Sequence, residues 1–474
     1  MGLQRQKVSG NKRLHADIEQ DECDTKIGNS KLKSFYSKLK FIMQITFFSS
    51  CRSKILLLLA ILLVFQPSRG SSQVIVKIQS VNAPLKRAVI SPGAIENRLK
   101  RFQNIEISNI PEVMKNHPQL IRVKLEDIIP ERNICLPDYV DLIPLDILAT
   151  DAKVIATTSN GEVLLKANTL LYRGNISDFG WINISFSNYG CSGLIKVNDN
   201  TYLFEPIAPD SSSIASIHCL YEINDLKKDD SWAESDVSQD SIFTNPSVLK
   251  SSTIQKSANI PNATIIDGNS VLTVKLAVDI SYRVYSQNFS NIKELALAYA
   301  IEQIAATSEL TERELKIKLE IGYLNIWTIS DPYHGDNGTE YLSSISSFWE
   351  TNRQDVTRDF TLILQDINSG WGESGGKYIF AGTNPSNIAH ELGHSFGAPH
   401  THDCAWPAGP NGTIAPIDSC SVKDDGCPCI NYSEIHNSGR GTIMSYCLNR
   451  HFSYHPLSRQ IIRDKMETSG RWGI

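Results

Sequence analysis

One short segment of the sequence gathers residue types that bind metal ions. The stretch AHELGHSFGAPHTHD, residues 389–403, contains His390, His394 and His400, with Glu391 directly after the first histidine. His390 and His394 are four residues apart, so on a helix their imidazoles lie on one face, one turn apart. That spacing lets both bind one Zn²⁺ ion. Glu391 points about 100° away around the helix, where it can reach a water on the metal rather than the metal itself.

The third histidine requires the helix to end before it. Gly397 can adopt the left-handed conformation of a helix-end turn, and Pro399 prevents the helix from resuming. The turn brings His400 back towards the metal. Three histidines and a water make an open, catalytic zinc site, whereas structural zinc normally has four protein ligands. The segment therefore predicts one catalytic Zn²⁺ held by the three histidines, with Glu391 as the base.

The helix that carries this segment has a clear beginning and a buried side. Asn384 can cap it, and Pro385 suits its first turn. Ile388, Leu392 and Phe396 recur every four residues and predict a stripe that packs into the core.

The elements around this helix predict an α+β domain over residues 263–474. Strand patterns and helical patterns alternate before the zinc helix, and a short helix ends the chain. The predicted strands are 271–281, 316–328 and 359–367, and the predicted helices are 290–306, 339–353, 386–397 and 456–470. This order implies a twisted mixed sheet with helices against it.

A different pattern precedes this domain. Residues 73–225 contain short β-like segments, at 73–81, 120–128, 152–158, 161–167 and 181–187. Residues 226–262 are rich in Ser, Asp and Asn with little apolar periodicity, which predicts an exposed linker.

The N-terminal region, residues 1–72, contains a candidate export signal. Its apolar core, Ile55–Phe65, has the length of a signal-peptide core and is shorter than a membrane-spanning helix. A polar leader of residues 1–42 precedes it. Translation from Met43 instead of Met1 would give a conventional signal peptide, whereas a retained leader would make the segment a signal anchor.

The cysteines and sequons agree with export. Five of the ten cysteines lie close together and are disulfide candidates: Cys404, Cys420, Cys427, Cys429 and Cys447. Since five is odd, one of them pairs elsewhere or stays free, and the Cys427–Cys429 pair leaves a metal site as the alternative. Seven N-glycosylation sequons all follow the apolar segment: Asn175, Asn183, Asn262, Asn288, Asn337, Asn411 and Asn431.

The charge balance bears on the partners. The chain has 46 basic and 51 acidic residues, a net charge of −5, without long runs of one sign. This argues against nucleic acid as a partner. A membrane is a partner only if the N-terminal segment is an uncleaved anchor.

The zinc segment, HExxHxxGxxH, is followed about fifty residues later by GTIMSYC, and together they resemble the metzincin clan of zinc endopeptidases. Met444 matches the Met-turn residue beneath the imidazoles. Within the clan the chain is most similar to the reprolysin (adamalysin, ADAM-like) family, because HDCAW matches the Cys-bearing segment after the zinc helix. Residues 180–206 and IHCLYE resemble the reprolysin propeptide. No disintegrin-like or Cys-rich module follows.

The resemblance implies a secreted zinc metalloendopeptidase made as a zymogen. In such enzymes a zinc-bound water attacks the scissile peptide bond while Glu391 acts as general base. The implied partners are extended polypeptide substrates and the chain's own propeptide. A membrane-anchored sheddase and an inactive secreted binding protein on the same fold are the alternatives. A propeptide thiol could bind the zinc, and the candidates for such a cysteine switch are Cys135, Cys191 and Cys219, although a propeptide disulfide is equally open.

Two departures from the family bear on the site. Thr401 and His402 stand between the third histidine and Asp403. Tyr446 lies two residues after Met444, as in astacins and serralysins, where such a phenol can stabilise the transition state; a core aromatic is the alternative. The S1′ pocket is expected between the zinc helix and residues 448–455.

Overall fold

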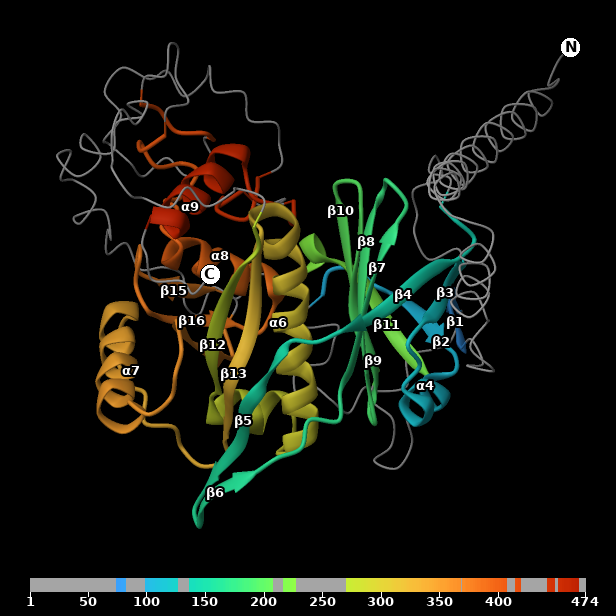
Figure 1. Ribbon diagram of the computed structural model, residues 1–474, viewed down its shortest axis with the longest axis horizontal. Helices are drawn as coiled ribbons and strands as arrows, with labels where there is room; N and C mark the ends of the chain where they lie inside the picture. The colour runs from blue at the N-terminus through green and yellow to red at the C-terminus, as the bar shows by residue number, and fades with distance from the viewer. Residues whose placement is uncertain are drawn as a thin grey trace, which may run out of the picture. The chain divides into compact units, whose positions relative to one another are not determined.

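The computed structural model describes residues 74–81, 99–126, 136–207, 216–226, 270–367, 369–406, 414–418, 441–447 and 451–468. They build a closed barrel and a separate mixed sheet with its helices (Figure 1). The predicted signal segment, residues 1–72, and residues 227–262 of the predicted linker lie outside these ranges.

The barrel is formed by the first part of the chain. Each strand pairs antiparallel with its neighbours except β1 and β3, whose parallel pairing closes the barrel. The interior is lined by alternate apolar residues, such as Val74, Val76 and Ile78 of β1. In barrel order the strands are β1 (Val74–Ser80), β2 (Gln103–Ile107), β11 (Ile217–Glu222), β10 (Asn200–Pro206), β9 (Gly190–Val197), β8 (Gly180–Ser187), β7 (Leu170–Ile176), β4 (Val140–Leu145) and β3 (Ile121–Glu126), and the helix α4 (Ile110–Asn116) links β2 to β3.

The second sheet is mixed, and its helices are those that the sequence predicts. The α+β prediction is therefore confirmed. The sheet order is β15 (Gly370–Gly372), β16 (Tyr378–Gly382), β14 (Phe360–Gln365), β12 (Leu272–Ile280), β13 (Ile317–Trp327), β5 (Leu148–Thr158) and β6 (Gly161–Leu164). The helices are α6 (Lys293–Leu315), α7 (Gly338–Asn352), α8 (Pro385–Ser395) and α9 (Pro456–Thr468). The edge strands β15 and β6 are antiparallel to their neighbours, and the other pairings are parallel.

The hairpin of β5 and β6 joins a sheet whose other strands all lie between Leu272 and Gly382. Residues 148–164 lie within the region that the sequence separates from the zinc-binding domain, yet β5 pairs with β13. Strand periodicity shows that a segment is half-buried but not which sheet receives it. Figure 1 shows the chain running from the barrel into this hairpin and back.

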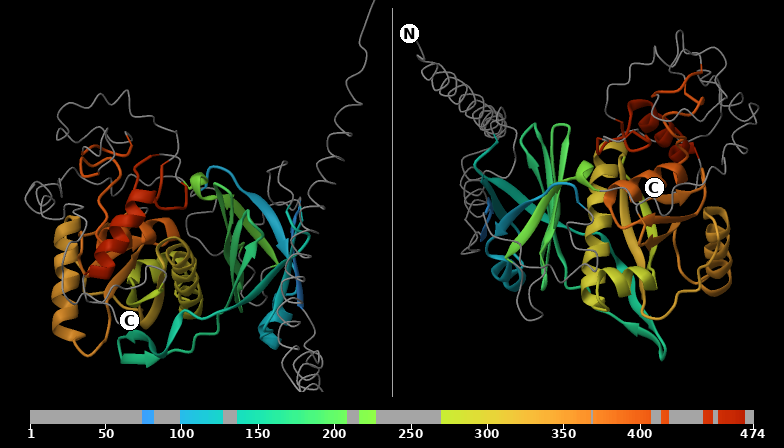
Figure 2. Two further views of the ribbon diagram at one scale, coloured as in Figure 1. Left: turned by 45° about the horizontal axis from the view of Figure 1, so that its top comes forward. Right: turned by 180° about the vertical axis from the view of Figure 1, so that it is seen from behind.

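Helix α6 is enclosed on both sides. One side packs on β13, and another contacts β8 and β9 of the barrel (Figure 2). Its buried residues surround the axis instead of forming one stripe, as expected for a helix with no solvent-facing side. This enclosure also buries polar groups, including Glu302 and Gln303, and the Gln303 amide donates a hydrogen bond to the Glu302 carboxyl.

We expect the stability of this region to depend on pH through Glu302. Burial, and then the charge of Glu205, raise the pKa of Glu302 to about 8, whereas an unfolded Glu titrates near 4.3. The folded state therefore keeps a proton that the unfolded state loses, so stability falls as pH rises between these values. Glu302→Gln does not titrate. Its free energy of unfolding should exceed that of wild type at pH 8 by on the order of a few kcal/mol, which raises its unfolding temperature, and should match that of wild type near pH 4. An equal difference at both pH values in thermal unfolding would contradict this origin.

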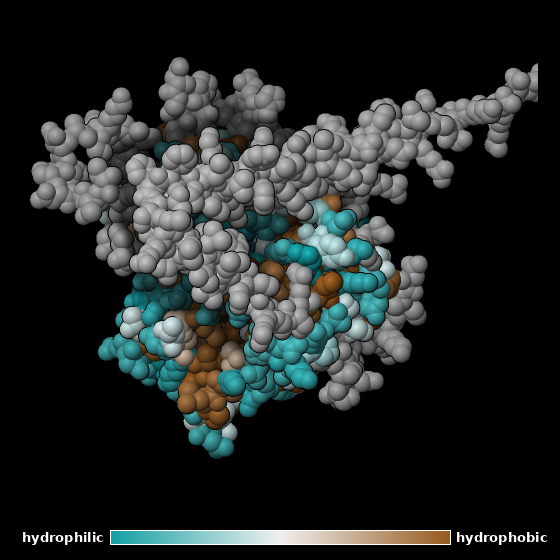
Figure 3. All heavy atoms as spheres, turned by 45° about the vertical axis from the view of Figure 1, so that its right-hand side comes forward, coloured by the Kyte–Doolittle hydropathy of each residue, from teal (hydrophilic) through white to brown (hydrophobic). Residues whose placement is uncertain are grey.

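Most of the described surface that Figure 3 draws is hydrophilic, with hydrophobic residues gathered in a limited area. The most exposed large apolar side chain in the described ranges is Leu164 at 76%, on edge strand β6. None of the helices in those ranges has the length and apolar character needed to cross a membrane.

Candidate metal centre

Helix α8 begins and packs as its sequence dictates. The side chain of Asn384 accepts a hydrogen bond from the backbone N–H of Asn387 at 2.9 Å, and Pro385 occupies the first turn. The predicted apolar stripe is almost fully buried and contacts the core of the sheet: Ile388, Leu392 and Phe396. The helix is thereby fixed in position and rotation.

The chain turns at the end of α8 through a left-handed glycine. Gly397 has φ of 98°, and its N–H donates to the His394 carbonyl at 2.7 Å. The N–H of Ala398 reaches back to the Gly393 carbonyl at 2.9 Å, a pair of bonds that closes the helix end. Lys465 of α9 donates to the Gly397 carbonyl at 2.6 Å. A side chain at 397 would be strained and would collide with Lys465.

The turn brings three imidazoles together. The Nε2 atom of His394 lies 3.1 Å from Nε2 of His390 and 3.0 Å from Nε2 of His400. Nitrogen ligands at 2.0–2.1 Å from a tetrahedral Zn²⁺ are ~3.3 Å apart. The three nitrogens thus have nearly the separation that a shared zinc ion requires, and the described residues contain no cysteine in this group.

Backbone carbonyls fix the ring tautomers. Nδ1 of His390 lies 2.6 Å from the Ile443 oxygen, and Nδ1 of His394 lies 2.9 Å from the Ala398 oxygen. Because a carbonyl only accepts, each Nδ1 carries the proton and each Nε2 keeps its lone pair. Burial lowers the pKa of His394 to about 4, so the ring is neutral near pH 7, as a metal ligand must be. Converging lone pairs repel one another without a cation, and this donor set fits zinc.

Met444, the residue that matches the Met-turn, is fully buried. Its sulfur would be only 2.4 Å from a Cβ atom at Gly393, so a glycine in α8 is what allows the sulfur to sit so close to the helix. The carbonyl of Met444 accepts from the N–H of Thr401 at 2.9 Å. The turn containing Met444 therefore connects the zinc helix to the segment that delivers His400.

A glycine-containing edge strand presses against Glu391. A Cβ atom at Gly370 would lie 2.5 Å from Cγ and 2.7 Å from Oε1 of Glu391, and one at Gly372 would lie 2.8 Å from the Glu391 carbonyl. Only glycine permits this approach of β15 to the carboxylate. Sequence reasoning missed both positions, although the spacing Gly-Trp-Gly just before the zinc helix could have suggested a close backbone contact.

We expect Gly370→Ala to impair catalysis without removing the metal. The added methyl group must displace the Glu391 side chain, which leaves the three histidines in place but misaligns the predicted base. The kcat value should fall by roughly 10²-fold, the effect of a misplacement of about 1 Å, with zinc content unchanged. Gly322→Ala is the matched control, because its methyl meets only the flexible side chain of Lys275. Equal kcat for both variants would show that β15 does not position Glu391.

The ring of Tyr446 belongs to the histidine cluster. Its centroid lies 4.5 Å from that of His400 and 6.2 Å from that of His390. His402 stacks on His400 at 4.9 Å with an interplanar angle of 13° and lies 4.6 Å from Tyr446. The inserted His402 thus packs against both His400 and Tyr446, which also contact each other, a position that sequence reasoning did not identify.

Hydrogen bonds also hold the segment after the third histidine. Asp403 Oδ2 accepts from the His400 N–H at 2.8 Å, and Trp406 Nε1 donates to the His400 carbonyl at 2.7 Å. Asp403 therefore braces the backbone at His400 despite the two residues between them.

The candidate switch cysteines lie elsewhere. Cys191 and Cys219 are buried in the barrel. The Cys219 thiol lies 3.9 Å from a Glu205 carboxylate oxygen, and the Cys191 N–H donates to His218. Burial raises the pKa of Cys191, which disfavours the thiolate that binds zinc. Neither residue fills the switch role in this structure, because both thiols are buried on barrel strands, β9 and β11, and neither belongs to the described metal-ligating groups. Four candidate cysteines lie outside the described residues: Cys135, Cys420, Cys427 and Cys429.

Two family models match this part of the chain. Metallo-peptidase family M12 matches residues 365–455, and metallo-peptidase family M12B reprolysin-like matches residues 297–401. The chain contains a reprolysin-like metallopeptidase domain. This reprolysin-like domain is a metalloendopeptidase, and its family implies a zinc cofactor, which agrees with the histidine geometry.

The crystal structure of metalloproteinase-II from Bacteroides fragilis is similar to this chain, with a TM-score of 0.32 and 10% identity over 62% of this chain and 85% of that chain. A comparison with curated proteins finds no match.

Proposed function

We propose that the protein is a secreted, zinc-dependent endopeptidase that is made as a zymogen and uses Glu391 as its general base. The observation that carries the proposal is the convergence of three Nε2 atoms with the Glu391 carboxylate one residue along the helix from His390. A bound zinc ion would supply a Lewis acid for the scissile carbonyl and for water.

The chain's own residues then move the proton and hold the substrate. Glu391, which is 4% exposed, accepts a proton from the attacking water and transfers it to the leaving amine. Strand β15 is an edge of the sheet next to Glu391. A polypeptide that pairs with this edge as an added strand would place one of its peptide bonds beside the carboxylate.

Tyr446 is the candidate for transition-state stabilisation. Its proximity to His400 supports a role for the phenol, while packing between histidine rings supports a purely structural role. Tyr446→Phe separates the two, because it removes only the hydroxyl. If the phenol stabilises the oxyanion, we expect kcat to fall roughly ten- to a thousandfold at nearly constant KM. Steady-state kinetics on one peptide measures this, and a wild-type kcat would leave Tyr446 as a packing residue.

The cysteines support secretion, whereas one of the seven glycosylation sequons does not. Cys404 and Cys447 are both disulfide-bonded, which suits an oxidising compartment. Of the sequons, Asn183 is fully buried on β8 and cannot carry a glycan in this fold. The membrane-anchored alternative depends on the N-terminal segment remaining uncleaved.

Latency is supported by contacts between the barrel and the segment after the Met-turn. The Trp181 ring of β8 lies 6.3 Å from Phe452, and Nδ1 of His451 lies 3.2 Å from the Asp199 carbonyl oxygen. Phe452 and His451 belong to residues 448–455, the segment expected to form a wall of the S1′ pocket. We propose that the barrel restrains this wall.

The test compares the full chain with enzyme that has been cut within residues 227–269 and then separated from its N-terminal segment. Peptide-library digestion should show cleavage that the zinc chelator 1,10-phenanthroline abolishes and that rises once the barrel segment is removed. Absence of cleavage in every form, with zinc bound, would favour the binding-protein alternative. Equal rates for the intact and the barrel-free enzyme would refute the zymogen. Mass spectrometry of the protein from culture medium and from membranes separates the secreted form from the anchored one.

A further inference from the structure

The hairpin of β5 and β6 is built into the catalytic sheet by backbone bonds along β13. Strand β5 pairs in parallel with β13 from Tyr323 to Trp327. The N–H groups of Ile321 and Thr328 donate to the carbonyls of Ile147 and Thr157, at 2.8 and 3.0 Å. Without the hairpin, β13 would be an unpaired edge strand.

Side chains of β5 enter the core on both faces of the sheet. Ile155 is fully buried in a cluster with Tyr323 and Trp349 under α7. Its neighbours Val154 and Ala156 point to the opposite face and belong to the main core with α6. The hairpin therefore completes two layers of the reprolysin-like domain.

Charged groups hold the outer strand of the hairpin. Glu162 of β6 lies 2.9 Å from Lys153 and 2.7 Å from Arg353 at the end of α7. The Arg353 guanidinium also lies over the Tyr323 ring, 5.8 Å from its centroid. One arginine of the later domain thus contacts both the hairpin and the strand that the hairpin covers.

A second contact joins the barrel to α6. Arg173 of β7 lies 3.1 Å from Glu309 and 2.9 Å from Glu312. The Glu309 side chain is 1% exposed, so losing a cationic partner would leave a buried charge with less compensation. Arg313 also lies over the Trp181 ring at 5.6 Å.

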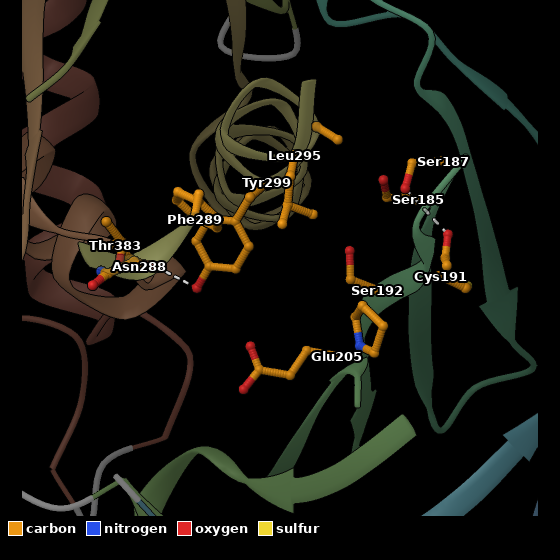
Figure 4. Close-up of a pocket in the computed structure, with 13 residues that line it drawn as sticks. Ser185, Ser187, Cys191, Ser192, Glu205, Asn288, Phe289, Leu295, Tyr299 and Thr383 are labelled. Atoms are coloured by element: carbon orange, nitrogen blue, oxygen red, sulfur yellow. Dashed lines mark hydrogen bonds between the residues drawn. The ribbon is translucent and has the colours of Figure 1, made fainter. Parts of the chain in front are cut away.

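The barrel does not pack directly against α6 along the whole length of the helix. Figure 4 shows Ser185, Ser192 and Glu205 of the barrel facing Leu295 and Tyr299 of α6 across a pocket. The hairpin, by contrast, has a paired backbone and buried side chains on both faces of the sheet.

We infer that a cut between residues 226 and 270 does not release the N-terminal segment. The segment stays bound as a non-covalent subunit, because β5 and β6 complete the catalytic sheet. Cleavage and release are then two separate steps, and release requires the hairpin to leave β13. This two-step release rests on the proposed zymogen. The pairing of the hairpin with β13 does not depend on catalytic activity.

The experiment uses the full chain with a specific endoprotease site inserted within residues 227–269. A Glu391→Gln background prevents self-digestion. After complete cutting, verified on a denaturing gel, native mass spectrometry and size-exclusion chromatography should show the two pieces as one 1:1 complex. Two folded pieces that elute separately at micromolar concentration would overturn the inference. The readout is mass, so an inactive enzyme would not mimic this failure.

Variants locate the attachment. Ile155→Asp puts a carboxylate into the aromatic cluster and should separate the cut pieces, whereas Leu164→Asp, at an exposed position of the same hairpin, should not. If Ile155→Asp prevents folding of the uncut chain, Arg353→Ala replaces it. It removes the contacts to Glu162 and Tyr323 and a third contact, to the Phe348 ring within α7, and should raise the dissociation constant at least tenfold. Arg173→Glu tests the α6 contact separately. Unchanged complexes in the Ile155 or Arg353 variants, with Arg173→Glu alone causing separation, would assign retention to α6 and refute the hairpin.

Discussion

Replacing Glu391 with glutamine should reduce peptide hydrolysis by roughly 10²–10⁴-fold, the usual contribution of a general base. Glutamine has nearly the same shape, and the approach of Gly370 leaves room for little else beside α8. An amide cannot accept the water's proton, so the chemical step loses its base while the zinc ligands remain. Steady-state kinetics on one peptide, together with metal analysis, measures both parts of the expectation.

The alternative outcomes of this substitution are distinct. If the variant retains zinc and wild-type turnover after repurification from contaminating proteases, another group acts as the base. If zinc is lost, Glu391 supports the metal directly, contrary to its place one residue away from the ligand His390. A bell-shaped pH profile in wild type that loses its acidic limb in the variant would attribute that limb to Glu391.

Replacing His394 with alanine should remove the metal and, with it, all measurable hydrolysis. His394 is the central histidine of the proposed zinc site, since its Nε2 lies about 3 Å from both other nitrogens. Two remaining histidines are too few for a stable catalytic zinc site. Zinc per chain, measured by plasma mass spectrometry after dialysis, should fall from about one to near zero.

A matched control is available in the same domain. His334 is exposed and lies outside the described metal-ligating groups, so His334→Ala should keep both zinc and activity. Circular dichroism verifies that each variant is folded. Normal zinc content in folded His394→Ala would refute the ligand assignment.

Local sequence determines most of the metal centre. The cap at Asn384, the turn at Gly397 and the spacing of the histidines each act within a few residues, so their physical effects are visible without tertiary information. The α+β order of the domain is predictable for the same reason, because helical and strand periodicities are local.

The features that sequence reasoning missed depend on residues far apart in the chain. Gly370 matters only because β15 passes Glu391, and His402 only because the turn after His400 stacks it against Tyr446. The burial of Cys191 depends on the pairing of distant strands in the barrel, which local sequence patterns do not predict. The partner of β5 is likewise a matter of register and topology rather than of periodicity.

The place of β5 in the sheet affects how the protein is synthesised. Thr157 and its hydrogen-bond partner Asn325 are 168 positions apart. At ~5–20 residues per second, a ribosome needs ~10–30 s to cover that interval. During this time the apolar residues of β5 have been translated but their partner strand has not. Such long-range pairing slows folding and exposes an unpaired strand to aggregation. The reprolysin-like domain therefore cannot complete its sheet in a strictly N-to-C order, and its yield should depend on whatever shields this hairpin until β13 is translated.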